Sequence, residues 1–456
     1  MQNSIDFEKF SRYSKAGPRY TSYPTALEFS ENFKYENYIN YLKSNKNKLS
    51  IYVHLPFCRS ACYFCGCNVV FTSKEDKLSR YITYLKKEID ILAETMDTTK
   101  EVIQFHFGGG TPTFYDASQL DEIMSYIKKK FPNWSDEAEI SVEIDPRFFN
   151  ENHMKIFKKH GFNRVSFGVQ DFDEKVQREI HRVQPFEITK NAVELARKFG
   201  INSINTDLIY GLPFQSLESF QNTLKLATSL NPDRFAIFNY AHVPWLKKTM
   251  RKFDETTLPT PDEKLKILKF TIDYLTNNGY KMIGMDHFAK PEDELFTAIA
   301  KGELHRNFQG YTTKGGATLI GIGLTSIGEG KRYYAQNYKR MDDYEKAIDE
   351  GRLPFERGVE LSDDDLIRKF VIMELMANFW VDIKRVESEF GIDFGDYFGA
   401  DLEKLKEFED ADLVKISKDK IEVSQTGTML IRNIAMAFDA YMDKYKNSKK
   451  SFSKTV

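Results

Sequence analysis

Cysteine is scarce in this sequence and confined to one place. Only 4 of the 456 residues are cysteines, and all of them lie between Cys58 and Cys67. A disulfide framework spreads its cysteines to join distant segments, and an exported chain begins with an apolar signal segment, which MQNSIDFEKF is not. We therefore expect a cytoplasmic protein whose clustered thiols form a metal site.

An excess of charge and long hydrophobic runs are also missing. The 65 basic residues nearly balance the 67 acidic ones, for a net charge of -2, so neither a nucleic-acid nor a membrane partner is indicated. No apolar run approaches the length that spans a bilayer. With 41% hydrophobic residues the chain can bury a large core, and we expect a soluble monomer.

From about residue 50 to 290, short β-branched or aromatic runs alternate with amphipathic stretches. The expected strands are Ile51–Leu55, Val102–Phe107, Glu139–Ile144, Arg164–Val169, Ser203–Ile209, Arg234–Tyr240 and Lys281–His287. The expected helices are Lys77–Ile91, Ala117–Lys130, Ile188–Phe199, Leu217–Leu230 and Glu263–Thr276. This alternation is typical of parallel strands joined by crossover helices, and it predicts an α/β core.

In such a core, functional side chains lie at the carboxyl ends of the strands. The unusual residues of this sequence fall there: the cysteine loop, Gly108-Gly109-Gly110, Glu143, Asp145, Gln170, Asp207, Ala241 and His242. Each residue alone is unremarkable. Their shared position predicts one active site at this rim.

The flanking segments suggest four parts. We expect an N-terminal arm (1–50), a barrel core (51–290), a barrel extension with substrate-site loops (291–360) and a mostly helical C-terminal domain (361–456). The last part has an expected helix, a strand pair and a final helix, typical of a winged helix: Asp363–Phe379, Leu413–Ile416 with Ile421–Val423, and Thr428–Lys444. Its candidate recognition helix, Leu402–Phe408, is surrounded by acidic residues, which argues against DNA binding.

The cysteine loop has the spacing C-x3-C-x2-C-x-C. Thiolates are the usual ligands of iron–sulfur clusters, and Cys58, Cys62 and Cys65 would leave one iron of a [4Fe–4S] cluster open to the amino and carboxylate groups of S-adenosylmethionine. A structural zinc bound by all four cysteines is the alternative. Zinc sites usually separate two cysteine pairs by a dozen residues or more, whereas this is one compressed loop, so the cluster is favoured.

Glycines and charged residues near the loop admit two interpretations. Gly109-Gly110-Thr111-Pro112 lacks the features of a phosphate loop, but adjacent glycines let a ligand approach the backbone; a simple turn would explain them as well. Glu143, Asp145 and Asp207 could bind ribose hydroxyls or a positive charge, or could be helix caps and ion-pair partners. Arg182 by default is a surface cation.

Several motifs together resemble the oxygen-independent coproporphyrinogen III oxidases of the radical S-adenosylmethionine superfamily. The resemblance runs almost from end to end. Besides the cysteine loop and Gly-Gly-Thr-Pro, it rests on Gly17-Pro-Arg-Tyr-Thr-Ser-Tyr-Pro24, Ser141-Val-Glu-Ile-Asp-Pro146, Gly168-Val-Gln-Asp-Phe172, Asp207-Leu-Ile-Tyr-Gly-Leu-Pro213, Phe238-Asn-Tyr-Ala-His242, Gly284-Met-Asp-His-Phe288, His305-Arg-Asn-Phe-Gln-Gly-Tyr-Thr312 and Leu430-Ile-Arg-Asn-Ile434.

That resemblance implies an incomplete (β/α) barrel, a [4Fe–4S] cluster on Cys58, Cys62 and Cys65, and two molecules of S-adenosylmethionine. By position in the family, the first molecule would be held by Tyr52, Gly109, Glu143 and Ile327. The second would contact Phe64, Gly110, Thr111, Gln170, Arg182, Asp207 and Ala241. Cys67, which the cluster does not need, is expected close to the reaction as a catalytic residue.

The implied reaction is oxidative decarboxylation of two propionates of coproporphyrinogen III to vinyl groups. The product would be protoporphyrinogen IX, in heme biosynthesis. An electron donor for the cluster and an electron acceptor are implied as partners. Because the substrate carries several carboxylates, we take Arg19, Arg306 and either Lys331 or Arg332 as candidate substrate-binding cations.

A heme-binding chaperone of the same superfamily is the alternative function. Such relatives typically lack the fourth cysteine and the N-terminal Gly-Pro-Arg-Tyr segment. Both features are present here, so the oxidase is favoured.

Overall fold

The computed structural model describes residues 5–446, which form two compact units. Among the described residues, the first unit comprises residues 5–28, 272–315 and 361–446, and the second comprises residues 29–271 and 316–360. These units cut across the four-part division expected from the sequence, which stays a proposal. No helix within the described residues is long and apolar enough to cross a membrane.

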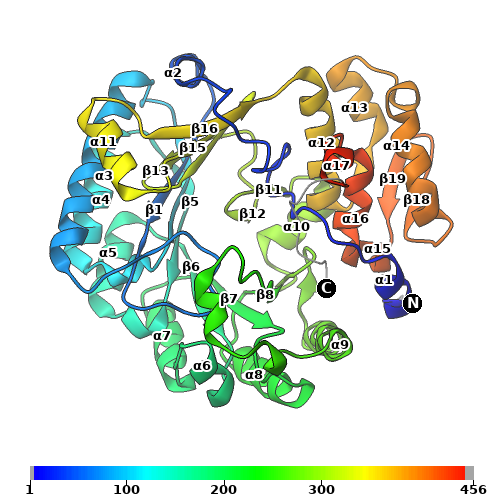
Figure 1. The fold of residues 1–456 in the computed structure, drawn as a ribbon, viewed down its shortest axis with the longest axis horizontal. Helices are drawn as coiled ribbons and strands as arrows, with labels where there is room; N and C mark the ends of the chain where they lie inside the picture. Colours follow the sequence, from blue (N-terminus) through cyan, green and yellow to red (C-terminus); the bar gives the residue numbers. More distant parts are fainter. Residues whose placement is uncertain (1–4, 447–456) are drawn as a thin grey trace. The chain divides into compact units, whose positions relative to one another are not determined.

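A large open sheet organises the second unit (Figure 1). Its consecutive parallel strands are β1 (Leu49–Leu55), β4 (Val102–Gly109), β5 (Trp134–Ile144), β6 (Arg164–Gln170), β7 (Ser203–Tyr210) and β8 (Arg234–Asn239). On the other side of β1 follow β13 (Thr318–Ile322), β14 (Ile327–Gly330), β15 (Tyr333–Asn337) and β16 (Phe355–Glu360). β13 runs parallel to β1, and the last three strands are antiparallel. The expected parallel core is confirmed.

The crossover helices bury one apolar face each. They are α3 (Glu75–Thr95), α4 (Ala117–Lys130), α5 (Glu151–His160), α6 (Glu174–Glu179), α7 (Phe186–Lys198) and α8 (Leu217–Ser229), and the unit also holds α2 (Tyr35–Lys43), α11 (Met341–Asp349) and, from residue 261 to 271, the start of α9 (Pro261–Asn277). Capping boxes at Asp116 and Ser216 begin α4 and α8, as expected for residues whose side chains accept from free backbone N–H groups. α5 was not among the helices named from the sequence; Asn150 caps its start and Gly161 its end.

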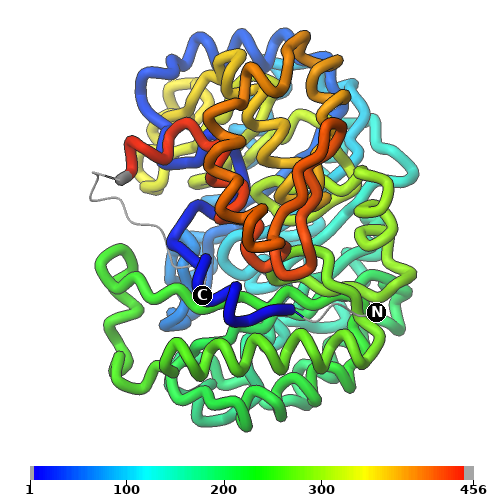
Figure 2. The backbone as a smooth tube through the Cα atoms, turned by 90° about the vertical axis from the view of Figure 1, so that its right-hand side faces the viewer, coloured from blue at the N-terminus to red at the C-terminus, as the bar shows by residue number. Residues whose placement is uncertain are grey.

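The first unit is mostly helical. Its elements are α1 (Phe7–Tyr13), α10 (Glu294–Lys301), the hairpin β11 (His305–Asn307) and β12 (Gly310–Thr312), α12 (Asp363–Asn378), β17 (Trp380–Asp382), α13 (Ile383–Phe390), α14 (Phe394–Glu409), β18 (Val414–Ile416) and β19 (Lys420–Val423). Figure 2 shows the β18–β19 hairpin beside the orange helices. β17 adds a third strand to the expected pair, and the winged-helix-like character is confirmed. The expected recognition helix lies within α14.

Two sequence expectations for this unit are wrong. Instead of one strand over Lys281–His287, there are two short antiparallel strands, β9 (Lys281–Met282) and β10 (His287–Ala289). The chain turns between them at Gly284, where an added Cβ would lie 2.5 Å from the Tyr311 hydroxyl. Gly284 and Asp286 are local signs of this turn, which the strand prediction over the run did not take into account.

The expected final helix Thr428–Lys444 is divided into short pieces. These are α15 (Gln425–Met429), α16 (Ile431–Ala435), η5 (Met436–Phe438) and α17 (Met442–Lys446). Side chains of these pieces contact the N-terminal segment: the Arg432 guanidinium donates to the carbonyls of Gly17 and Pro18, and Asp439 accepts from the Tyr20 hydroxyl at 2.8 Å. The N-terminal segment is therefore hydrogen-bonded to the divided C-terminal segment within this unit.

Candidate active site

The cysteine loop lies at the carboxyl end of β1 and is held at both ends by main-chain pairing. β2 (Phe57–Cys58) runs parallel to β3 (Val70–Phe71). The Val70 N–H donates to the Pro56 carbonyl at 2.8 Å, and the Thr72 N–H donates to the Cys58 carbonyl at 3.0 Å. The two ends of the cysteine loop are therefore fixed side by side at the edge of the sheet.

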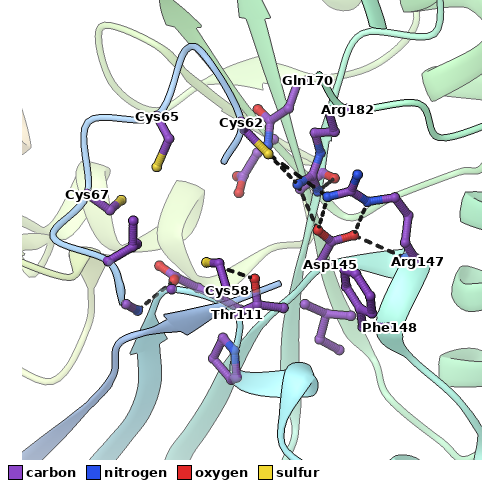
Figure 3. A pocket seen from close by; sticks show the side chains of 18 of the residues that line it. Cys58, Cys62, Cys65, Cys67, Thr111, Asp145, Arg147, Phe148, Gln170 and Arg182 are labelled. Carbon is purple, nitrogen blue, oxygen red and sulfur yellow. Dashed lines mark hydrogen bonds and ion pairs between the residues drawn. The ribbon is translucent and has the colours of Figure 1, made fainter. Parts of the chain in front are cut away.

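A cavity of about 260 Å³ opens inside this loop at the rim of the sheet. Its wall contains all four cysteines and most of the residues expected to hold cofactors (Figure 3): Cys58, Cys62, Phe64, Cys65, Cys67, Gly109, Gly110, Thr111, Glu143, Gln170, Arg182 and Asp207. The strand-end positions therefore converge on one cavity, as parallel-sheet geometry predicts.

The expected positions Tyr52, Ala241 and Ile327 do not contribute to the cavity wall. Tyr52 lies behind it, where its ring stacks on His106 with centroids 5.9 Å apart and its hydroxyl is 3.0 Å from His54 Nδ1. Ile327 begins β14, which is antiparallel to β13. Ala241 directly follows Tyr240, whose N–H donates to the Tyr210 carbonyl.

The thiols of the loop have different surroundings. Cys58 Sγ lies 3.3 Å from the Thr111 hydroxyl, and burial raises the pKa of Cys58 to about 12. The neighbouring Cys67 thiol lowers the pKa of Cys65, because it stabilises the Cys65 thiolate. Because a metal ligand must be a thiolate, binding at Cys58 would release a proton.

Asp145 pairs with two arginines, and both arginines also lie close to the Cys62 sulfur (Figure 3). Arg182 Nη1 donates to Asp145 Oδ2 at 2.8 Å and lies 3.7 Å from Cys62 Sγ; Arg147 Nη2 donates to the same Oδ2 at 2.7 Å and lies 3.9 Å from the sulfur. Burial alone would raise the pKa of Asp145, but the two guanidinium groups outweigh it and hold the pKa below 3.8. Cys62 therefore faces two fixed positive charges.

Sequence reasoning did not identify Arg147. It follows Pro146 and could have been any surface cation, yet only 17% of its side chain is exposed. The signal that could have found it is its place two residues after Asp145, whose carboxylate it contacts through Nε at 3.0 Å.

The two glycines after β4 bring main chain close to the cavity. Gly109 has φ +118°, and its N–H donates to Glu143 Oε2 at 3.2 Å. A Cβ on Gly110 would lie 2.7 Å from the Pro56 carbonyl carbon and oxygen. Gly110 is thus required by a close approach of two backbone segments, and a side chain there would displace the cysteine loop.

Glu143 is kept charged by its neighbours. Burial raises its pKa, but His106, whose Nε2 lies 3.6 Å from Glu143 Oε1, and the Gly109 N–H outweigh burial and hold the pKa below 4.5. A carboxylate of this kind at the cavity wall can bind an ammonium group.

Gln170 and Asp207 also line the cavity. Gln170 has φ +69°, a left-handed conformation unusual for a residue with a side chain, and it coincides with a register shift between β6 and β7. Such strain is typical of functional sites. Asp207 accepts from the Ser166 hydroxyl at 3.0 Å and the Asn205 amide at 2.6 Å.

The candidate substrate-binding cations lie elsewhere than the cavity wall. Arg19 and Arg306 belong to the first unit, and Lys331 and Arg332 to the second. Within the first unit, Arg306 lies over the Tyr311 ring, 4.7 Å from its centroid, and its Nε and Nη1 are buried without a hydrogen-bond partner. Their assignment to substrate propionates stays a prediction.

The cysteines can be tested for their fit to an iron–sulfur cluster. Within residues 5–446, no three His, Cys, Asp or Glu side chains converge on the position of a single metal ion. A cubane does not require that convergence, because each cysteine binds its own iron. Thiols that line one cavity, with guanidinium groups facing the Cys62 sulfur, are a donor set that fits an anionic cluster.

Comparison with known proteins places the chain in a family. Residues 52–227 match the model of the Radical SAM superfamily, and residues 361–430 match that of the HemN C-terminal domain. Oxygen-independent coproporphyrinogen III oxidase of Helicobacter pylori strain J99 is 58% identical, over 99% of this chain and 100% of the relative. The chain belongs to the oxygen-independent coproporphyrinogen III oxidases. This enzyme family also includes the Escherichia coli K12 protein, 43% identical over 99% of this chain and 98% of that one.

A solved structure agrees with this membership. The E. coli coproporphyrinogen III oxidase, described as a radical SAM enzyme, superposes with a TM-score of 0.92 at 43% identity, over 97% of this chain and 100% of that one. The expected fold class is therefore confirmed, and the family's cofactors are a [4Fe–4S] cluster and S-adenosylmethionine. The relatives do not favour the heme-binding chaperone.

Proposed function

We propose that this chain catalyses the oxygen-independent oxidative decarboxylation of two propionates of coproporphyrinogen III, giving the vinyl groups of protoporphyrinogen IX in heme biosynthesis. The observation that carries the proposal is the cavity that joins Cys58, Cys62 and Cys65 to the Gly109-Gly110-Thr111 turn, in a chain of this family. The free thiols suit the reducing cytoplasm, where we place the enzyme.

Cys58, Cys62 and Cys65 would hold the cluster, leaving one iron to S-adenosylmethionine. When bound, the reduced cluster and S-adenosylmethionine supply a 5′-deoxyadenosyl radical that removes a hydrogen atom from the β-carbon of a propionate. That C–H bond is too weakly acidic for a side-chain base at neutral pH, and homolytic abstraction by a radical suits this step. Each propionate then loses carbon dioxide and one electron, which an acceptor takes up.

The protein's part is to bind, orient and exclude water. Glu143, kept charged by His106, suits the methionyl ammonium of a first S-adenosylmethionine, beside Gly109. We include Tyr52 and Ile327 in this first site by their position in the family. Arg182 and Asp145 fix the opposite wall.

We include a second S-adenosylmethionine in the proposal, contacted by Phe64, Gly110, Thr111, Gln170, Arg182, Asp207 and Ala241. All except Ala241 line the same cavity. The buried Nε of Arg182, which has no hydrogen-bond partner, is a donor that such a ligand could use.

Anaerobic turnover with coproporphyrinogen III, S-adenosylmethionine and a reductant tests the reaction. Mass analysis should show a product that has lost two molecules of carbon dioxide and four hydrogen atoms. Cleavage of S-adenosylmethionine without any loss from the tetrapyrrole would refute the assigned substrate.

A further inference from the structure

The segment after β8 carries the two most exposed large hydrophobic side chains reported for the described residues. Trp245 is 61% exposed and Leu246 is 71% exposed. Single exposed apolar residues are ordinary, but two adjacent ones on an ordered loop indicate an interaction surface. We call residues 244–252 the tryptophan loop.

The tryptophan loop is folded, so the exposure is not a consequence of disorder. On its inner side Met250 and Phe253 are buried and contact Val243 and Tyr240 in one apolar cluster. The N–H groups of Leu246 and Lys247 both donate to the Val243 carbonyl, at 2.9 and 3.0 Å, and Arg251 Nε donates to the Pro244 carbonyl at 2.8 Å. The fold thus holds Trp245 and Leu246 outward.

Positive charge surrounds these two side chains. The loop contains four cations and no acid: Lys247, Lys248, Arg251 and Lys252. The acids that follow, Asp254 and Glu255, are engaged locally, because Asp254 accepts from the Thr256 N–H and Glu255 pairs with His242 at 3.0 Å. An apolar centre with a basic rim is complementary to an acidic protein surface.

The tryptophan loop is joined directly to the cysteine loop. Lys247 Nζ donates to the Cys67 carbonyl at 2.9 Å. Val243 belongs to the same apolar cluster as Phe64 and Tyr63, which lie between Cys62 and Cys65. The tryptophan loop and the residue before it therefore meet the cysteine loop at two places, through Lys247 and through Val243.

We propose that the tryptophan loop is the docking surface for a small acidic protein that delivers single electrons to the cluster. The proposal rests on the proposed function, which needs one electron for every S-adenosylmethionine cleaved. In each encounter the donor is oxidised by one electron and the cluster is reduced by one. Electron-transfer complexes are typically small and transient, which suits a patch of two apolar residues and a basic rim.

The test compares two reductants on the same reconstituted enzyme. Trp245→Ala/Leu246→Ala and Lys248→Glu/Lys252→Glu remove the apolar centre and reverse the basic rim, respectively. Lys225→Glu/Leu226→Ala, at exposed positions of α8, is the matched control. The readout is 5′-deoxyadenosine formed with dithionite, or with subsaturating reduced flavodoxin as the acidic donor.

With flavodoxin, both loop variants should raise the KM for the donor about tenfold, the effect of losing about 1.4 kcal/mol of binding. Dithionite-driven cleavage should be unchanged, as should both activities of the α8 control. The wild-type KM should rise with ionic strength. An unchanged flavodoxin KM in both loop variants would overturn the proposal, and so would equal losses with both reductants. Failure of the proposed function would differ from this: the wild type would then leave coproporphyrinogen III unchanged with either reductant, whether or not S-adenosylmethionine is cleaved.

Discussion

Arg182 Nη1 lies 3.7 Å from Cys62 Sγ while it donates to Asp145 at 2.8 Å. The contact places a guanidinium, itself fixed by a carboxylate, against one expected cluster ligand. Asp145 is ionised at neutral pH, because its pKa is held below 3.8. The ligand sulfur thus has a charged environment before any cofactor is bound.

The first prediction concerns ligation. Cys62→Ser should lose the brown chromophore, most of the iron and all S-adenosylmethionine cleavage, because a serine hydroxyl is a poor substitute for a thiolate at iron. Iron and sulfide analysis of anaerobically reconstituted protein measures it. Normal iron content together with normal activity would exclude the cluster assignment.

Cys67 should behave differently from the other three. A fourth thiolate on the cluster would block the open iron, so Cys67→Ser should keep iron and chromophore but form less product. Iron analysis beside turnover separates the possibilities. Loss of the cluster would make Cys67 a ligand, whereas full activity would leave it a packing role.

Arg182 is assigned to the second S-adenosylmethionine only. Arg182→Ala should retain the cluster, since Arg147 still pairs with Asp145 at 2.7 Å, but should lower turnover. Equilibrium binding should show the second molecule weakened more than the first. Equal weakening of both sites, or of neither, contradicts the assignment.

Arg147 should influence the cluster's reduction potential. Arg147→Met removes a positive charge and a donor 3.9 Å from Cys62 Sγ, which disfavours the more negative, reduced cluster. If the contact is worth about 1 kcal/mol, the midpoint potential falls by about 40 mV. Redox titration followed by electron paramagnetic resonance measures this. Arg147→Lys, which keeps the charge, should restore part of the shift; an unchanged potential in Arg147→Met would show that the contact has no electronic effect.

Glu88 of α3 should make stability depend on pH. It accepts from the Gly323 N–H at 2.8 Å and the Tyr344 hydroxyl at 2.6 Å, and burial raises its pKa to about 7. The folded state therefore binds this proton more tightly than the unfolded chain does. Its stabilisation is complete below about pH 4.5 and is lost as the pH rises towards 7.

Glu88→Gln should flatten that pH dependence and lower the free energy of unfolding by about 1–3 kcal/mol, because either orientation of the amide sets its N–H₂ against at least one donor: Asn337, or Gly323 and Tyr344. Denaturant unfolding at pH 5 and pH 7 measures both effects. Glu94→Gln, at an exposed position of the same helix, is the control and should change neither. A wild-type slope retained in Glu88→Gln would assign the titration to another group.

The parallel core was predictable because its signal is local. Runs such as Ile51–Leu55 are buried strands in a regular alternation with amphipathic helices, and their carboxyl ends carry the polar residues. The parts that failed also involve distant contacts. At Gly284 the Tyr311 ring leaves no room for a Cβ, and the divided final segment contacts Gly17 and Pro18 through Arg432.

The site residues show the same division. Cys58, Cys62 and Cys65 are recognisable by spacing, and Glu143 or Asp207 by strand-end position. Arg147 and Glu88 are not, because an arginine after a proline and a glutamate in an amphipathic helix look like surface residues. Their roles follow from burial beside partners that the linear sequence does not indicate.

The ends of the cysteine loop are fixed by main-chain hydrogen bonds through Pro56, Cys58, Val70 and Thr72. Peptide groups are the same in every sequence, so this anchorage does not depend on which side chains the loop carries. The residues between these two anchors can therefore be exchanged without changing how the loop is attached to the sheet. Cysteine loops from other iron–sulfur proteins could replace the residues between Pro56 and Thr72, with Gly110 retained beneath them. Such replacements would vary the chemistry of the cluster while the sheet stays unaltered.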